Sequence, residues 1–179
     1  MTNSSERYTY GINPSDVITW VSDEWLRFAQ ENDAPELSVA HVIGQSLWRF
    51  IVGADVQRIY QELFRSLRSK RAELIIPFRC DSPTVVRHME LTLRSPGNGV
   101  LEFEGRLLRH EMREPVSVFY RHAQRSNESI SICSLCRRLL WQKEWIDVGA
   151  MIVRRRLFNT EPIPRLDETV CPDCRSKLA

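Results

Sequence analysis

The chain has 179 residues, of which 42% are hydrophobic and 27% are charged. This composition allows one globular domain of ordinary size and a smaller appendage, and it argues against a second full domain. The formal net charge of +2 excludes a polycation that neutralises nucleic-acid phosphates over its whole surface.

The N-terminal residues contain no apolar core of signal-peptide length, and nowhere do roughly 18 apolar residues follow one another without interruption. We therefore expect a cytoplasmic protein that does not cross a membrane. In a reducing compartment, paired cysteines are more often metal ligands or redox thiols than structural disulfides.

The first predicted element is a strand over residues 17–21 (VITWV), which are mostly β-branched or aromatic. A turn at Ser22-Asp23 leads into a second apolar stretch up to Glu31, which is either a strand or a short helix because the window is too brief for periodicity to decide. Residues 46–51 (SLWRFI) predict one or two helical turns.

The clearest periodic pattern runs over residues 55–69 and predicts an amphipathic helix, with Asp55 placed to cap the helix or to complement its dipole. The expected buried face consists of Val56, Ile59, Tyr60, Leu63 and Leu67.

Apolar residues then alternate with polar ones in three runs, at 74–78, 85–93 and 101–107, which predicts three antiparallel strands. Turn residues separate the runs. Pro77 lies inside the first run, and because proline cannot donate to a strand ladder, we expect that strand at a sheet edge.

Residues 114–130 lose the pattern and are predicted to form a linker, with a short helix around 116–124. The division that follows from these patterns has an N-terminal flank at 1–14, a first domain at 15–113, this linker, and a cysteine-containing segment at 131–179.

The order of strand, strand, short helices, long helix and three antiparallel strands resembles a PAS domain. The similar stretches are DVITWVSDEWLRFAQEN, VIGQSLWRFI, FRCDSP and VLEFEGRLLRHE, between residues 15 and 113. The resemblance implies an α+β fold: a five-stranded antiparallel sheet with helices on one face, whose strand after the long helix lies at an edge. It also implies a sensing or protein-interaction role, and self-association through the N-terminal flank and the outer sheet face. Within one chain, Tyr8 to Ile12 could instead cover a sheet edge.

The strongest motif is Cys133-Ser-Leu-Cys136, then a spacer of 34 residues, then Cys171-Pro-Asp-Cys174. Two CxxC knuckles supply the four sulfurs of a tetrahedral Zn²⁺ site. The stretches SICSLCRRLLWQKEWIDV and VCPDCRSKL resemble a cysteine-paired extension of some bacterial PAS-containing signalling proteins, with Glu168-Thr169-Val170 where those have Ser-His-Gly.

So short a segment rarely folds on its own core, and a bound metal ion would supply the missing free energy. Basic residues beside the knuckles favour thiolate over thiol; they are Arg137, Arg138 and Arg175. The residues available for a small core around the metal are Trp141, Trp145, Ile146, Val148, Ile152, Leu157 and Phe158.

Two other chemistries fit the same cysteines: a thiol redox sensor that releases zinc on oxidation, and structural disulfides. Spacing and compartment favour zinc over both. A site with four thiolates has no open coordination position, and the chain shows no catalytic constellation, so we expect no enzymatic activity.

A PAS cavity would be lined by aromatic residues, for which the candidates are Trp20, Trp25, Trp48 and Phe78; the sequence does not identify a ligand. The flavin-adduct cysteine of light-sensing relatives would fall near residues 44–50, and the haem-ligating histidine of others in 55–69. Neither residue type occurs there, which argues against both cofactors. Cys80 is interpreted as a small buried apolar group.

A basic run, Arg154 to Arg156, raises the alternative of a zinc-ribbon protein that contacts nucleic acid in transcription. Such a short run is more often a solvated face, so a protein partner in signalling is favoured over nucleic acid. The expected whole is a PAS-like module, possible as a homodimer, with a structural zinc ion in a small C-terminal segment.

Overall fold

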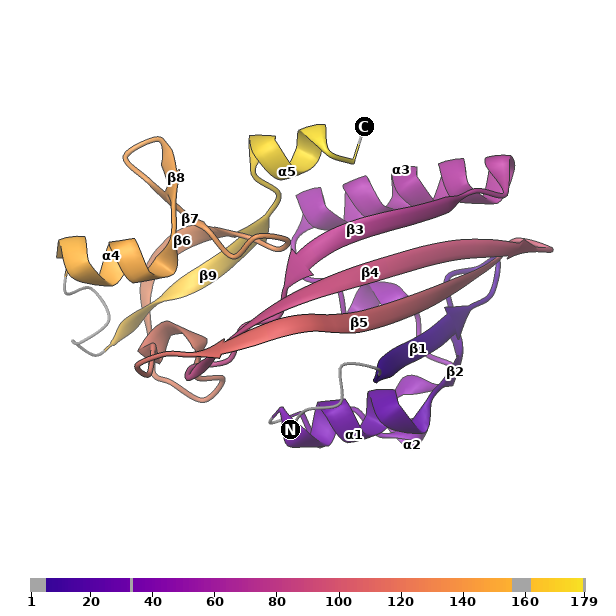
Figure 1. Ribbon diagram of the computed structural model, residues 1–179, viewed down its shortest axis with the longest axis horizontal. Coiled ribbons are helices and arrows are strands. Elements are labelled where there is room, and N and C mark those ends of the chain that lie inside the picture. Colours follow the sequence, from indigo (N-terminus) through magenta and orange to yellow (C-terminus); the bar gives the residue numbers. More distant parts are fainter. Residues whose placement is uncertain (1–5, 33, 156–161, 179) are drawn as a thin grey trace. The chain divides into compact units, whose positions relative to one another are not determined.

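The computed structural model describes residues 6–32, 34–155 and 162–178 (Figure 1). It divides into two compact units. The first contains residues 1–52, 57–77 and 89–109, and the second contains residues 53–56, 78–88 and 110–179. Over the described ranges, no helix has both the length and the apolar character needed to cross a membrane.

A five-stranded antiparallel sheet has most of its residues in the first unit. Its order is β2-β1-β5-β4-β3, so β3, which contains Pro77, is an edge strand as the proline predicts (Figure 1). The strands are β1 (Arg7–Ile12), β2 (Ile18–Val21), β3 (Glu73–Arg79), β4 (Val85–Gly97) and β5 (Val100–Met112).

The helical elements connect β2 to β3. They are α1 (Asp23–Glu31), α2 (Val39–Val42), the 3₁₀ turn η1 (Leu47–Arg49) and α3 (Ala54–Lys70). Ser22 caps α1 by accepting a hydrogen bond from the Trp25 amide at 3.2 Å, so the ambiguous stretch is a helix rather than a strand. In α3, Leu63 is only partly buried, whereas Phe64, absent from the expected buried face, is 1% exposed.

The core of the first unit is aromatic. Tyr10 of β1 stacks on Phe103 of β5 with ring centroids 4.4 Å apart, and Phe64 of α3 meets Phe103 edge-on at 5.5 Å. Tyr8, on the same side of β1 as Tyr10, contacts Phe28 of α1 at 4.5 Å. Helices α1 and α3 therefore pack on one face of the sheet, as expected.

The expected N-terminal flank, 1–14, requires correction. Residues 7–12 form β1, an inner strand that pairs with both β2 and β5. Tyr8 is 8% exposed and Ile12 is fully buried, so these side chains belong to the core. The partner strand β5 begins some 90 residues further along the chain. The local sequence pattern therefore could not predict which core these side chains belong to.

The opposite face of this sheet carries a row of charges that neutralise one another. Arg94 of β4 lies between Glu73 of β3 at 2.5 Å and Glu104 of β5 at 3.6 Å, and Glu104 also binds Arg7 of β1 at 2.6 Å. The arginine of each pair is exposed, so each pair contributes little stability by itself. The row keeps this face polar, although Ile75 is 52% exposed on it.

The second unit contains a four-stranded sheet of order β8-β7-β6-β9, in which β6 and β9 are parallel (Figure 1). Its elements are η2 (Ser117–Phe119), β6 (Arg125–Cys133), β7 (Leu139–Trp141), β8 (Glu144–Ile146), α4 (Val148–Arg155), β9 (Ile163–Thr169) and α5 (Pro172–Ser176). The expected linker, 114–130, therefore already contains η2 and the start of β6, and the cysteine segment does not begin at 131.

An apolar cluster holds this unit together, so it is larger than a segment folded around a metal alone. Its buried members are Val116, Val118, Ile130, Ile132, Leu139, Val148 and Met151. Trp141, Ile146 and Ile152, expected in a small core, pack partly buried against it. Leu157 and Phe158 lie outside the described residues. The linker contributes Val116 and Val118 because its short helix folds onto the sheet.

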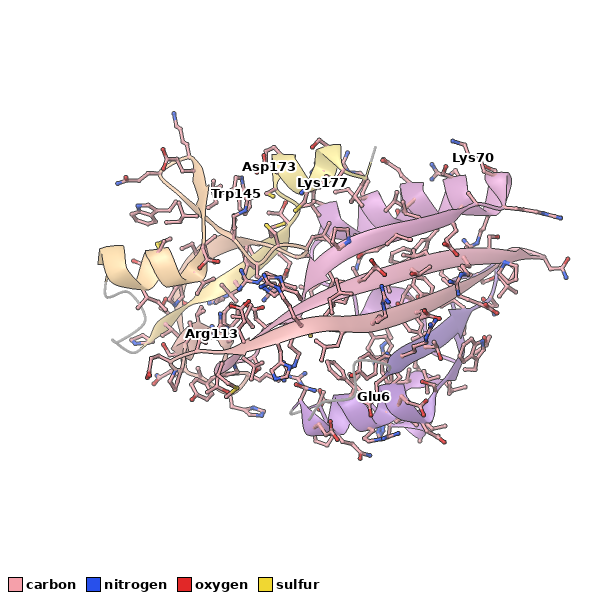
Figure 2. The ribbon with its side chains drawn as sticks, in the orientation of Figure 1. Glu6, Lys70, Arg113, Trp145, Asp173 and Lys177 are labelled. Atoms are coloured by element: carbon pink, nitrogen blue, oxygen red, sulfur yellow. The ribbon has the colours of Figure 1, made fainter. Side chains whose placement is uncertain are left out.

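The second unit also buries a carboxylate completely. The side chain of Asp81 is 0% exposed and accepts hydrogen bonds from Arg79 at 2.5 Å and from Arg113, which is labelled in Figure 2, at 3.1 Å. Arg79 also binds Asp147 at 2.9 Å, and the Arg113 guanidinium lies 4.8 Å from the ring centroid of Phe119. Because a buried charge is costly without partners, the second unit should be sensitive to the loss of Asp81 or of either arginine that binds it.

Candidate metal centre

The first knuckle is a tight turn at the end of β6. Cys133 is the last residue of β6, and its amide donates to the Arg138 carbonyl at 2.9 Å while its carbonyl accepts from the Arg137 amide at 2.9 Å. Arg137 adopts a positive φ of 60°, which closes the turn. This turn brings Cys136 back beside Cys133.

The second knuckle follows β9. Because β9 runs parallel to β6 with Thr169 opposite Cys133, the chain delivers Cys171 to the end of the sheet where the first knuckle lies. Cys171 precedes α5, whose first residue is Pro172, a position where proline's missing N–H costs nothing. The Cys171 amide donates to the Cys133 sulfur at 3.4 Å. The pairing of β6 with β9 thus brings the two ends of the long spacer together.

The four predicted ligands come together: the Sγ atoms of Cys133, Cys136, Cys171 and Cys174 all lie within 4.8 Å of one another. A tetrahedral ion with Zn–S bonds of about 2.3 Å requires sulfurs about 3.8 Å apart. The Cys136 and Cys171 sulfurs are 3.7 Å apart, which fits that spacing. The donor set suits a thiophilic ion, and the cluster could hold a metal.

The pKa values of Cys133, Cys136 and Cys174 are shifted in different directions. The hydrogen bond from the Cys133 thiol and then the Arg138 guanidinium lower the pKa of Cys136 to about 4. The same hydrogen bond and burial raise the pKa of Cys133, and burial raises the pKa of Cys174 to about 12. Without a further cation the thiols of Cys133 and Cys174 stay protonated, so a divalent ion is what would allow four thiolates to share this space.

Of the three arginines expected to favour thiolates, one contacts sulfur. Arg138 donates to Cys136 Sγ at 3.3 Å and Cys171 Sγ at 3.7 Å. Arg137 instead binds Glu168 at 2.9 Å and lies over the Phe119 ring, and Arg175 binds Asp55 at 2.5 Å. Arg138 therefore meets the expectation by direct contact, whereas Arg137 and Arg175 contact carboxylates, and an effect of their charges on the thiols stays a prediction.

Residues before the second knuckle, at the place of Ser-His-Gly in the resembling proteins, have structural partners here. Glu168 accepts from Ser134 Oγ at 2.7 Å, and Thr169 Oγ1 donates to Asp55 at 2.9 Å. Gly53, with φ +93°, lies so near that an added Cβ would be 2.4 Å from the Glu168 carbonyl oxygen. Sequence patterns gave Asp55 a helix-capping role but could not indicate its contact with Thr169, since more than 100 residues separate the two.

Cys80 lies apart from the four-sulfur cluster. It is partly buried, and burial raises the pKa of its thiol. A protonated, partly buried thiol is a poor nucleophile, which agrees with its interpretation as a small apolar group.

The four aromatic residues expected to line a ligand cavity have different surroundings. Trp20 is 39% exposed and covers Gly11, Trp25 is 6.4 Å from Tyr10, and Trp48 donates to Asp16 at 3.0 Å. Phe78 belongs to the second unit, at the end of β3. Their role in ligand binding stays a prediction.

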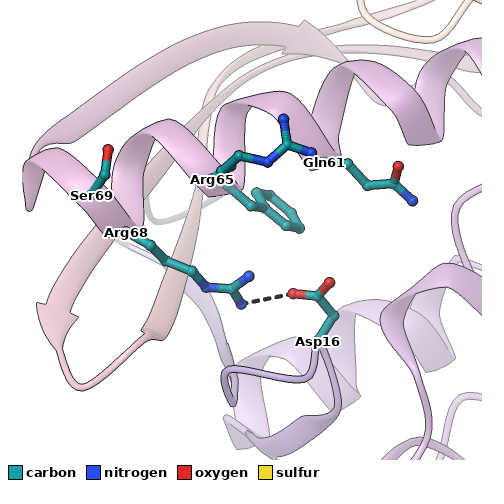
Figure 3. A pocket seen from close by; sticks show the side chains of 6 residues that line it. Asp16, Gln61, Arg65, Arg68 and Ser69 are labelled. Atoms are coloured by element: carbon teal, nitrogen blue, oxygen red, sulfur yellow. Dashed lines mark hydrogen bonds and ion pairs between the residues drawn. The ribbon is translucent and has the colours of Figure 1, made fainter.

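A pocket of about 510 Å³ opens beside α3 in the first unit, and none of those four aromatic residues lines it (Figure 3). An ion pair at 2.7 Å between Asp16 and Arg68 crosses it. The lining residues are Asp16, Gln61, Phe64, Arg65, Arg68 and Ser69.

The basic run that suggested nucleic-acid binding lies at the end of a described range of the chain. Arg154 and Arg155 are the last residues of α4, and Arg156 lies outside the described residues. The structure therefore does not place these three side chains.

No known family model matches this chain, and no curated protein is significantly similar to it. The metal centre is accordingly assigned from its own geometry.

Proposed function

We propose that this protein is a non-enzymatic signalling module, in which a PAS-like sensing or interaction domain is joined to a unit held by a structural Zn²⁺ ion. The observation that carries the proposal is the convergence of four cysteine sulfurs within 4.8 Å from two knuckles 34 residues apart in sequence.

Zinc is favoured by the donor set. Four thiolates in tetrahedral array are the ligands of structural zinc sites, and the spacing of two residues within each knuckle is typical of them. Such a shell leaves no coordination position for a substrate, so the ion would stabilise the fold and would not act as a Lewis acid on a bound molecule. When bound, it supplies the positive charge that four buried thiolates need.

The PAS-like assignment is supported by the first unit. Its elements occur in the order that the resemblance implies, its helices lie on one face of a five-stranded sheet, and β3 is an edge strand. The pocket beside α3 has a volume within the range of small-molecule sites. These features favour a sensor or a binding domain over an enzyme.

The proposed output is contact with a protein partner. Apart from the PAS-like region and the metal-bearing unit, the sequence contains no effector signature, so a signal would pass through a surface and not through a reaction. Nucleic acid is the less favoured partner, because the net charge of the chain is small.

Native mass spectrometry of the full chain, purified without chelator, tests the proposal. We expect one zinc ion per chain, with elemental analysis confirming the element. A mass shift from a retained small molecule would support sensing, and a doubled mass would support the homodimer. A chain that carries well under one equivalent of zinc and four free thiols at the knuckles would reject the metal centre.

A further inference from the structure

The four cysteines of the metal centre differ in their access to solvent. Cys133 and Cys171 are 0% exposed and Cys174 is 8% exposed, whereas Cys136 is only partly buried. A reagent that approaches from solvent therefore meets the sulfur of Cys136 before the others. Any attack on the centre should begin at this ligand.

The Arg138 side chain contacts this ligand. The Arg138 Nε lies 3.3 Å from the Cys136 sulfur, and its Nη2 lies 3.7 Å from the Cys171 sulfur. Asp173, labelled on α5 in Figure 2, accepts from the same Nη2 at 2.7 Å and fixes the orientation of the guanidinium. The backbone of Arg138 is fixed as well, since its carbonyl accepts from the Cys133 amide at 2.9 Å.

This placement has a physical consequence for a loaded centre. Four thiolates and one divalent ion sum to a charge of −2, and a guanidinium in contact with two of the sulfurs offsets part of it. Donated N–H groups withdraw electron density from the sulfur lone pairs, which lowers their nucleophilicity. The side chain also occupies space next to the Cys136 sulfur, since its Nε lies 3.3 Å away.

We propose that Arg138 shields the metal centre, so that soft electrophiles reach it at Cys136 and the rate of metal release is set by this one side chain. This inference rests on the proposed metal centre and adds to it the point of attack and the residue that controls it. Arg138 acts through the ligands and is a positioning residue.

N-ethylmaleimide is a suitable probe because its reaction with a metal-bound thiolate is simple. The Cys136 sulfur adds to one alkene carbon, so that an S–C bond forms while the C=C π bond and the metal–sulfur bond break. Water then gives a proton to the neighbouring carbon. The thioether that results is a weak ligand, and the released zinc is measured with the colorimetric chelator 4-(2-pyridylazo)resorcinol, while peptide mass spectrometry locates the modified cysteine.

The variants to compare in the full, zinc-loaded chain are Arg138→Met, which keeps the aliphatic stem, and Arg138→Lys, which keeps the charge. Arg137→Met is the matched control, since Arg137 is the neighbouring arginine and binds Glu168 instead of a sulfur. We expect Arg138→Met to release zinc about 10- to 100-fold faster than wild type, by analogy with the 10- to 100-fold loss of metal affinity when a group hydrogen-bonded to a ligand is removed. Arg138→Lys should be intermediate and Arg137→Met close to wild type, with Cys136 modified first in the wild-type chain.

Equal release rates in wild type and Arg138→Met, or an equal acceleration by Arg137→Met, would overturn the proposal. So would first modification at a cysteine other than Cys136. If Arg138→Met does not retain zinc through purification, the order of modification in wild type and the rate of Arg138→Lys still decide. A wild-type chain that never holds zinc is a separate result, which rejects the metal centre itself.

Discussion

The two units of this chain are stabilised by different kinds of interaction. The first buries an aromatic and aliphatic core in which Phe64 and Phe103 are about 1% exposed and Leu93 and Leu101 are fully buried. The second adds to its apolar cluster four clustered thiols and a fully buried aspartate. The first unit should therefore respond to changes of packing, and the second to changes of metal, oxidation and charge. Four predictions test this contrast.

The largest effect is expected from Cys136→Ser. A structural zinc site contributes about 10–16 kcal/mol in small metal-dependent domains, so the loss of one thiolate should abolish stoichiometric zinc binding and unfold much of the second unit. Hydrogen exchange should then accelerate at β6 and stay slow at β1. The matched control is Cys80→Ser, outside the cluster, which should keep one zinc ion. Equal zinc content in the two variants would contradict the ligand assignment.

Phe64→Ala should affect the first unit instead. Its side chain is almost fully buried between Trp48 and Phe103, and truncation of a buried phenylalanine costs about 3–5 kcal/mol. Leu63→Ala, at the adjacent and only partly buried position, should cost less. Urea unfolding followed by tryptophan fluorescence measures both. Zinc content should be unchanged, and a loss of zinc in Phe64→Ala would break the proposed separation of the two units.

Asp81→Asn removes the buried charge of the second unit while keeping the shape of the side chain. Because Arg79 and Arg113 would lose their shared carboxylate, we expect a loss of about 3 kcal/mol in the free energy of unfolding. Asp147→Asn is the control: that carboxylate is 54% exposed and also binds Arg79, and its loss should cost at most about 1 kcal/mol. Similar values from calorimetry for both variants would show that burial is not decisive here.

The smallest expected effect is a loss of stability at alkaline pH. Burial raises the pKa of Tyr60 to about 12, whereas an unfolded tyrosine titrates near 10. Tyr60 thus contributes to the free energy of unfolding in full below about pH 10. This contribution is lost as the pH rises toward 12, because the unfolded chain releases the tyrosine proton first. The loss is at most roughly 3 kcal/mol. Tyr60→Phe should flatten the slope of stability against pH in this range. An unchanged slope would show that the hydroxyl is solvated in the folded chain.

The elements that could be predicted from the sequence are those with a strong local signal. The apolar period of α3 and the alternation in β3, β4 and β5 indicate these elements because one face of each is buried. Pro77 indicates the sheet edge by its missing N–H alone. The four ligands follow from the chemistry of the CxxC knuckle, which needs only two intervening residues.

Other features depend on partners distant in sequence. The side chains of β1 found their core only through pairing with β5. Likewise, the residues of the expected linker fold back onto the second sheet. Short windows cannot decide such cases, because the energy that selects them comes from contacts that close long loops.

The two neighbouring arginines of the first knuckle show the limit most clearly. The sequence by itself determined that cations stand beside the cysteines, since Arg137 and Arg138 directly follow Cys136. Only the tertiary structure decided which of the two arginines contacts the sulfurs. The positive φ at Arg137 directs its side chain toward Glu168 and Phe119, while Arg138 reaches Cys136 and Cys171. The carboxylates that hold both guanidinium groups are more than 30 residues away, and folding alone brings them close.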